Sequence, residues 1–311
     1  MITIESISKE YPDKILFKNL SFKLTENMRL GLVGHNGSGK STLLKILLGS
    51  ESPDKGKIHK TATSNIGYLP QEIMAGNENT IMDEVLAGFP ELSIIENDIH
   101  LINEKLKKEP NNIKFLNTLS SLQMQFEQLD GWRIEKKAKT ILSGLGFSEK
   151  QFHERFNTFS GGWRMRCYLA GILLKEPNYL FLDEPTNHLD LHAIIWMEEF
   201  LSSWKGSLIM ISHDRTFLDK SINNILELNE GNSNLYKGNY TNYVNKRKEV
   251  IKHNNKTYDN QQKDIAQTKK FIERFRAKNT KAKQVQSKIK HLEKIELVEY
   301  IDDRNNIIKI N

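Results

Sequence analysis

The sequence predicts an α/β fold built on a mainly parallel sheet, with an inserted helical subdomain and a basic helical hairpin after it. Three observations lead to this prediction. Short apolar runs alternate with helical segments up to about residue 240, residues 84 to about 160 are polar and helix-forming, and the chain beyond Tyr240 is long, basic and helical. Short buried strands separated by helices are typical of parallel sheets, because the crossover helices cover both faces.

The first strands and the first helix have simple sequence features. Residues 1–5 alternate like a strand, and residues 29–33 form a short apolar run that leads into a glycine-rich turn. Residues 41–48 then show a helical pattern that stops at Gly49, since glycine readily takes the left-handed conformation that ends many helices.

Two further strands are expected at residues 178–182 and 207–211. Between them, residues 191–204 predict a helix because their apolar positions recur at helical spacing. We expect one face of this helix to carry Ile194, Ile195, Met197, Leu201 and Trp204.

The expected organisation is a domain over residues 1–240, which contains the helical subdomain at about 84–160, followed by a hairpin over 241–297. Two thin apolar stripes should pack together in this hairpin, since their residues recur at 4–3 spacing. The stripes are Tyr258, Ile265, Thr268, Ile272 and Phe275 on one helix, and Val285, Ile289 and Leu292 on the other. Residues 298–311 are expected to start a second, truncated domain, because 305–310 alternate like a first strand.

Charge is distributed unevenly along the 311 residues, whose net charge is +6. Residues 245–294 hold 16 Lys or Arg against 5 Asp or Glu, a net of +11 that leaves −5 for the rest. Such asymmetry indicates a polyanionic partner, although a solvated charged helix is the plainer alternative.

The composition predicts a cytoplasmic protein without membrane insertion. No apolar run approaches the roughly 18 to 20 residues that span a bilayer, and the N-terminus lacks the layout of a signal peptide. Cys167 is the only cysteine, which excludes an intrachain disulfide and fits a reducing compartment.

Residues 34–41, Gly-His-Asn-Gly-Ser-Gly-Lys-Ser, fit the phosphate-loop pattern between a strand and a helix. The glycines Gly34, Gly37 and Gly39 allow the backbone to wrap around phosphates, and the helix N-terminus adds a positive end. Lys40 supplies a charge to the β- and γ-phosphates, and the Ser41 hydroxyl is suited to Mg²⁺. The other nucleotide-contacting residues expected here are Asn36, Ser38 and Thr42. A glycine-rich turn without function is the alternative, and the flanking elements argue against it.

An apolar strand at residues 180–182 ends in Asp183 and Glu184, which supply the second half of the site. Asp183 is expected to reach the Mg²⁺ shell through a water molecule. Glu184 is placed to orient or deprotonate the attacking water. An adjacent acidic pair is weak evidence alone, and the phosphate loop strengthens it.

Three more segments carry a family resemblance over residues 1–240. Residues 159–163, Phe-Ser-Gly-Gly-Trp, resemble the signature of ATP-binding cassette proteins, residues 68–71 their glutamine loop, and residues 212–214 their switch histidine. The resemblance implies the P-loop ATP-binding cassette fold, an ATPase activity and the cofactors ATP and Mg²⁺.

The roles that the resemblance implies are specific. Ser160 and Gly162 would hold the γ-phosphate of ATP bound to an opposite domain, so the chain would pair with a second cassette or head-to-tail with another copy. Gln71 would sense Mg²⁺ and the γ-phosphate, and His213 would steady the γ-phosphate and the water. Asp190 resembles the loop that crosses the dimer interface.

Two aromatic residues are compared with the family pattern, one that matches it and one that departs from it. Tyr11 matches the aromatic residue that stacks on adenine in the family, and a tyrosine that merely packs at a strand end is the alternative. Trp163 stands where the common signature has glutamine, and an indole cannot reproduce the hydrogen bonds of that amide.

Residues 161–166 and 183–190 resemble the ABC-F group, whose members have two cassettes in one chain, no membrane domain, and mostly act on ribosomes. Residues 236–240 resemble the entry to the interdomain linker of this group, and residues 275–284 the basic linker that reaches ribosomal RNA. The resemblance implies ATP-dependent control of translation, in some members with antibiotic resistance, and a ribosome or structured RNA as partner of residues 241–297.

Two other function classes stay open. The ATPase subunit of a membrane transporter explains residues 1–240 equally well, but it does not explain the basic hairpin. A chromosome- or repair-type ATPase carries its coiled coil between the phosphate loop and the signature, whereas the charged hairpin here follows the ATPase core.

Overall fold

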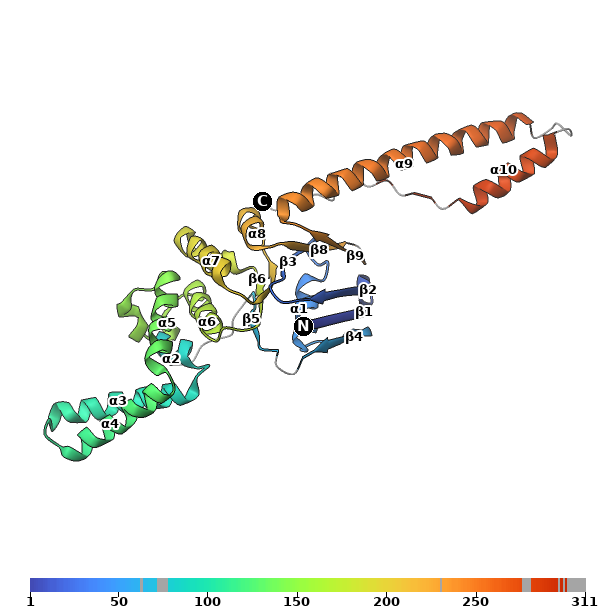
Figure 1. Cartoon of the computed structure of the whole chain (residues 1–311). Helices are drawn as coiled ribbons and strands as arrows, with labels where there is room; N and C mark the ends of the chain where they lie inside the picture. The colour runs from blue at the N-terminus through green and yellow to red at the C-terminus, as the bar shows by residue number, and fades with distance from the viewer. Residues whose placement is uncertain are drawn as a thin grey trace. The chain divides into compact units, whose positions relative to one another are not determined.

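The computed structural model describes residues 1–61, 64–71, 78–229, 231–275, 281–295, 297–298 and 300. The chain divides into two compact units, Met1–Tyr240 and Thr241–Asn311 (Figure 1). Among the described helices, none is long and apolar enough to cross a membrane.

A six-stranded sheet forms the centre of the first unit, in the order β5-β6-β7-β3-β8-β9. All neighbouring strands pair in parallel except β8 and β9, which are antiparallel. The strands are β3 (Arg29–Val33), β5 (Ile66–Leu69), β6 (Tyr179–Asp183), β7 (Ser207–Ile211), β8 (Asn224–Asn229) and β9 (Asn232–Lys237). The predicted mainly parallel α/β fold is therefore confirmed.

A second sheet contains three antiparallel strands in the order β2-β1-β4. These are β1 (Ile2–Tyr11), β2 (Lys14–Leu24) and β4 (Lys55–Lys60). Helix α1 (Lys40–Leu48) shares one apolar core with both sheets, which explains why Leu43, Leu44, Ile46 and Leu47 are all buried. The enclosed helix begins at the phosphate loop, so the core fixes the position of that loop.

The helical subdomain lies between β5 and β6 in the chain. Its elements are α2 (Ile81–Leu86), α3 (Pro90–Lys108), α4 (Ile113–Gln128), α5 (Gly131–Gly144) and two short 3₁₀ helices, Glu149–His153 and Phe156–Thr158. Helices α3 and α4 run side by side as an antiparallel pair (Figure 1). Helix α6 (Gly161–Leu174) then leads into β6.

A 3₁₀ turn (Pro185–His188) and helix α7 (Leu191–Ser203) connect β6 to β7, and α8 (Arg215–Ser221) connects β7 to β8. The predicted buried face of α7 is wrong at one position, because Ile195 is exposed. The buried residues are Ala193, Met197 and Leu201. Successive residues of a helix are about 100° apart, so Ile195 points away from the stripe that these three residues form.

The second unit contains α9 (Tyr240–Phe275) and α10 (Ala282–Lys294). The two helices lie against each other, since Lys288 Nζ is 5.6 Å from the centre of the Phe271 ring. Tyr258, Ile265, Thr268 and Ile272 of α9 are half-buried, as is Leu292 of α10. Ile289 of α10 is 37% exposed. The described residues do not include 276–280, the side chains of Phe275 and Val285, or the strand expected at 305–310.

A candidate nucleotide-binding site

A pocket of about 550 Å³ lies beside the phosphate loop, where β6 and β7 end. In parallel α/β sheets, ligands bind at the carboxyl ends of the strands because the loops and helix N-termini gather there. The pocket is lined by Tyr11, Asn36, Gly37, Gly39, Lys40, Ser41, Thr42, Gln71, Asp183, Glu184 and His213, all of them predicted, together with Lys14, Leu16 and Ile211.

The phosphate loop takes the backbone shape that its glycines allow. Gly37 has φ of 76° and Gly39 has φ of 97°, both in the left-handed region that disfavours other residues. At Gly34, an added Cβ would collide with the Leu228 carbonyl and the Ser38 hydroxyl. Gly34 and Ser38 thus lie behind the pocket and set the shape of the loop, and Ser38 Oγ is buried without a hydrogen-bonding partner.

Lys40 begins helix α1 and lies in the pocket. Its ammonium donates hydrogen bonds to the carbonyl of Gly34 at 2.8 Å and of His35 at 3.1 Å. Burial lowers the pKa of Lys40, while the nearby Glu184 and Asp183 carboxylates oppose that shift. A buried ammonium next to a loop of backbone N–H groups is suited to hold a polyphosphate.

Asp183 is the last residue of β6 and is only 4% exposed. Burial raises its pKa, and a hydrogen bond with the Ser41 side chain and the charge of Lys40 oppose this rise. A hard divalent cation binds oxygen ligands such as a carboxylate and a hydroxyl, and its charge stabilises the ionised form of a buried carboxylate.

Glu184 follows directly and takes the left-handed conformation, with φ of 54°. Its backbone N–H donates to the Ile211 carbonyl at 2.9 Å, which ties the end of β6 to the end of β7. Carboxylate atom Oε2 accepts from the His213 backbone N–H at 3.1 Å. Oε1 makes no hydrogen bond and lies 3.3 Å from Nε2 of His213. Burial raises the pKa of Glu184, and the adjacent His213 opposes the rise.

The oxygen atoms that line the pocket are suited to a magnesium ion that takes most of its other ligands from a nucleotide and water. In the described part of the chain, no group of three or more His, Cys, Asp or Glu side chains is arranged to hold a metal by itself. Magnesium bound with substrate phosphates needs only one or two protein ligands and retains several waters. Ser41, Asp183 and Gln71, which all line the pocket, offer oxygen atoms of the required kind.

Lys14 was not predicted as a site residue. It starts β2, and its Nζ lies 3.2 Å from the position that a Cβ would occupy on Gly37. Its ammonium therefore adds a second positive charge next to the phosphate loop. No motif marks this position in the sequence, because the antiparallel sheet brings it there.

The signature residues Ser160 and Gly162 do not line this pocket. Ser160 precedes helix α6 and makes no side-chain capping hydrogen bond, and an added Cβ on Gly161 would meet nothing within 4 Å. The start of α6 is thus an open helix N-terminus with free space around it.

Asp190 also lies outside the pocket and has partners in its own chain. Its Oδ1 accepts from the Ala193 backbone N–H at 3.0 Å and caps α7. Its Oδ2 accepts from Arg166 Nη1 at 2.8 Å. The hydrogen bond from Ala193 and then that from Arg166 lower the pKa of Asp190, and burial opposes them.

Arg166, which was not predicted, connects the signature helix to the loop after β6. It is buried and donates from Nε to the His188 carbonyl at 2.7 Å and from Nη1 to the Leu145 carbonyl at 3.1 Å. The Trp163 ring lies 4.6 Å from its guanidinium carbon. Trp163 also packs edge-on against Phe147, so it takes a packing role at this position.

Comparison with protein families agrees with this fold. A model of the ABC transporter family matches residues 17–187, and a second ABC transporter model matches residues 226–310. The first match covers more than half of the chain.

Curated relatives include "Probable ATP-binding protein YheS" of Haemophilus influenzae, which is 37% identical over 305 residues, or 97% of this chain and 46% of the relative. ABC transporter F family member 5 of Arabidopsis thaliana is 33% identical over 305 residues, or 96% of this chain and 44% of the relative. The chain thus spans about half the length of the curated relatives it matches.

Two solved structures share the fold at low sequence identity. The ATP-binding subunit of an ABC transporter has a TM-score of 0.56 at 17% identity, covering 76% of this chain and 90% of that one. The dimeric cassette MJ0796 bound to ADP and phosphate has a TM-score of 0.53 at 19% identity, covering 76% of this chain and 98% of that one.

Proposed function

The chain belongs to the ABC transporter family and is an ABC-F-type cassette protein, and from this premise we propose that it binds and hydrolyses MgATP to control its binding to ribosomes. Cassettes of this family are ATPases that bind ATP. The observation that carries the proposal is that one pocket is lined by the phosphate loop together with Gln71, Asp183, Glu184 and His213.

Binding of the nucleotide is assigned to the phosphate loop. The backbone N–H groups of residues 36–42 surround the phosphates in this proposal, and Lys40 neutralises their charge. Magnesium, held by Ser41, Asp183 and Gln71, supplies charge compensation for the phosphate oxygens when bound. Tyr11, at one end of the same pocket, is assigned to the base.

Hydrolysis is assigned to Glu184 and His213. The raised pKa of Glu184 suits a group that accepts a proton from water, because a general base works best when its pKa approaches the working pH. His213 lies against Oε1 of that carboxylate and orients it, while Gln71 approaches from the loop after β5.

We assign the side of the γ-phosphate that faces away from the phosphate loop to a second cassette. Ser160 and Gly162 supply that side of the site to a partner, either a second cassette of a longer chain or another copy in head-to-tail arrangement. The open N-terminus of α6, with its positive dipole end, is suited to an anionic phosphate. The related cassette MJ0796 is described as dimeric.

The ribosome is assigned to the second unit, which we propose is an interdomain linker over residues 241–297. Lys252, Lys256, Lys263, Lys269 and Lys270 of α9 are exposed, as are Lys283, Lys288, Lys290 and Lys294 of α10. Lysines on a helical hairpin are suited to phosphate contacts and to reading the shape of structured RNA. Residues 298–311 are proposed to lead into the second cassette.

Co-sedimentation with purified ribosomes tests this assignment. A variant in which Lys252, Lys256, Lys263, Lys269 and Lys270 become glutamine should bind about tenfold more weakly or worse. Its salt dependence should also be reduced, because binding with fewer phosphate contacts releases fewer counterions. The matched control replaces five exposed lysines of the first unit, namely Lys57, Lys108, Lys114, Lys136 and Lys150. Equal weakening in both variants would contradict a specific role for the hairpin.

A further inference from the structure

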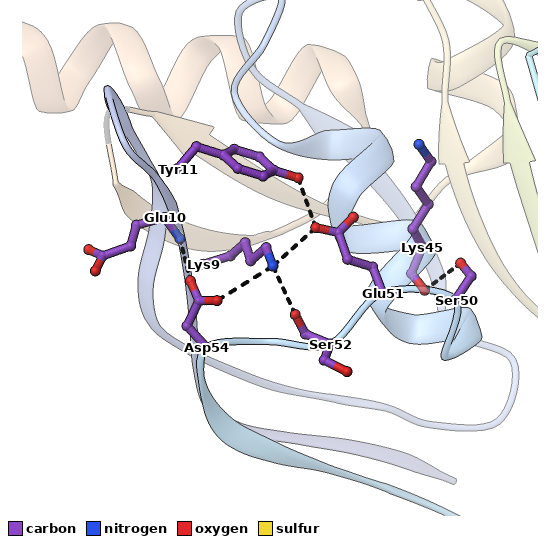
Figure 2. A network of polar contacts seen from close by, with 8 residues as sticks. All are labelled: Lys9, Glu10, Tyr11, Lys45, Ser50, Glu51, Ser52 and Asp54. Carbon is purple, nitrogen blue, oxygen red and sulfur yellow. Dashed lines mark hydrogen bonds and ion pairs between the residues drawn. The ribbon is translucent and has the colours of Figure 1, made fainter.

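Tyr11, which lines the nucleotide pocket, belongs to a network of polar contacts (Figure 2). The Tyr11 hydroxyl donates a hydrogen bond of 2.8 Å to Oε1 of Glu51. The ammonium of Lys9 lies 3.1 Å from the same oxygen. Glu51 comes from the turn after helix α1, so the network links that turn to strand β1.

Lys9 is itself held firmly. Its side chain is only 12% exposed, and its Nζ also donates to the Ser52 carbonyl at 3.0 Å and to Asp54 Oδ1 at 3.5 Å. The other oxygen of Asp54 accepts from the Glu10 backbone N–H at 2.7 Å. Two acceptors besides Glu51 therefore hold the ammonium in place, and one of them, Asp54, is also bonded to β1.

Glu51 is fixed to helix α1 by the turn that ends the helix. Gly49 has φ of 88°, and the backbone N–H groups of Gly49, Ser50 and Glu51 all donate to the Lys45 carbonyl at 3.0, 3.0 and 3.3 Å. Helix α1 begins at Lys40 and Ser41, and its nine residues span about 13 Å at 1.5 Å per residue. One short, buried helix thus carries the phosphate-binding groups at its start and the Tyr11 acceptor at its end.

The network matters for Tyr11 because packing alone holds this ring weakly. Tyr11 is 47% exposed, and an exposed side chain without a polar anchor exchanges between rotamers. The hydrogen bond to Glu51 fixes its hydroxyl end, and Lys9 lies 5.6 Å from the ring centre.

We propose that Glu51 is a positioning residue for nucleobase recognition, holding the Tyr11 ring at a fixed distance from the phosphate loop while Lys9 holds Glu51. This inference rests on the proposed assignment of Tyr11 to the base. In this arrangement the Tyr11 ring is held in place before a nucleotide binds. Less side-chain entropy is then lost on binding.

The protonation states agree with this arrangement. Acceptance by Glu51 raises the pKa of Tyr11, so the phenol stays protonated and keeps its donor. The same hydrogen bond is the main cause that lowers the pKa of Glu51, with Lys9 adding to it, so the acceptor stays ionised.

Binding of MgATP and of magnesium tripolyphosphate, measured by calorimetry, separates positioning from a general structural role. Tripolyphosphate has no base and serves as the reference. Glu51→Ala should raise the Kd for MgATP by about five- to tenfold, as expected when a charged hydrogen bond and part of a base stack are lost. The Kd for tripolyphosphate should stay within about twofold, since no phosphate contact is removed.

Four further variants sharpen the test. Glu51→Gln keeps an acceptor and should restore most of the affinity for MgATP, while Tyr11→Phe removes only the hydroxyl and should match Glu51→Ala. The double variant Glu51→Ala/Tyr11→Phe should be no worse than either single variant, because the two groups act through one hydrogen bond. Glu198→Ala removes another lysine-paired carboxylate, far from this network in sequence, and should leave both Kd values unchanged.

The outcomes are distinct. If Glu51→Ala changes neither Kd, or raises both equally, the positioning role is wrong while the nucleotide site stands. Additive effects in the double variant would also contradict it. If the unmodified chain binds neither MgATP nor tripolyphosphate, the proposed function itself fails, and this inference fails with it.

Discussion

The nucleotide pocket gathers buried charge, whereas the start of helix α6 is exposed and has no acidic residue in its first turn. In the pocket, Asp183 and Glu184 are nearly inaccessible and have raised pKa values because burial disfavours their ionised forms. At the signature segment, Ser160 and Gly161 are exposed. The two regions belong to one cassette, yet they do not line the same pocket.

This difference between the two regions agrees with the separate roles that we propose for them. The charges of the buried carboxylates and of Lys40 are compensated by a ligand that carries charges of both signs. This region is therefore suited to bind MgATP without a second cassette. An open helix N-terminus offers weak, directional attraction, so it is suited to complete a site on another cassette. Variants in each region should therefore affect binding and hydrolysis differently.

The largest effect is expected from Glu184→Gln. Removal of a general base typically lowers the rate by about 10² to 10⁴, so ATP hydrolysis measured by phosphate release should fall by such a factor. The Kd for MgATP should change little, since Lys40 and the loop remain. A variant that hydrolyses ATP like the parent would show that Glu184 is not the base.

Gly162→Asp should affect hydrolysis without affecting binding by the single chain. The nearest atoms to an added Cβ at Gly162 are those of His188 at 3.8 Å, an ordinary contact, so the variant should fold. A carboxylate at this helix start should repel the phosphate of the partner and lower hydrolysis about tenfold or more, as loss of one phosphate-stabilising contact does. An equal rise in the Kd for MgATP would mean that the two regions share one site after all.

Arg166→Met tests the connection between the two regions. Three hydrogen bonds to Asp190 and to the Leu145 and His188 carbonyls are lost, and the bond to the Leu145 carbonyl is a buried one. We expect a loss of about 1 to 3 kcal/mol in the free energy of unfolding, measured by urea denaturation. Lys220→Met, which removes an exposed ion pair with Glu198, is the control and should cost less. Equal losses would contradict a structural role for Arg166.

The smallest effect is expected from a substitution of Glu96 in α3, a carboxyl group that does not line the nucleotide pocket. Burial, with Glu135 and Asp83 nearby, raises the pKa of Glu96 from 4.5 to about 7. The folded state therefore disfavours ionised Glu96, and this cost grows as pH rises from about 4.5 through about 7 and is constant above. Glu96→Gln should raise Tm at pH 8 and leave it unchanged at pH 4, while MgATP hydrolysis stays normal. A constant Tm difference at both pH values would contradict the raised pKa.

The sequence predicted the phosphate loop, the acidic pair and the central strands because each depends on local chemistry. Gly37 and Gly39 are required by the loop itself, and Asp183 follows an apolar strand whatever surrounds it. The three-stranded sheet was missed, since its strands pair across the chain and their faces are partly polar. Lys14, Glu51 and Arg166 were missed for the same reason: their partners are set by tertiary contacts.

Two predictions show where local pattern misleads. Ile195 is apolar at a near-helical spacing, yet the buried stripe of α7 runs through Ala193, Met197 and Leu201. Trp163 appeared as a departure from the family signature, and its packing on Arg166 and Phe147 gives it a role that the spacing alone did not suggest.

The mass of the Glu184→Gln variant in solution tests the division between the two regions most directly. With MgATP, light scattering should show a shift from monomer to dimer, because trapped ATP holds the phosphate loop of one copy against the signature of another. With MgADP the variant should stay monomeric. A variant that binds MgATP tightly and yet remains monomeric at every concentration would contradict a site shared between two cassettes.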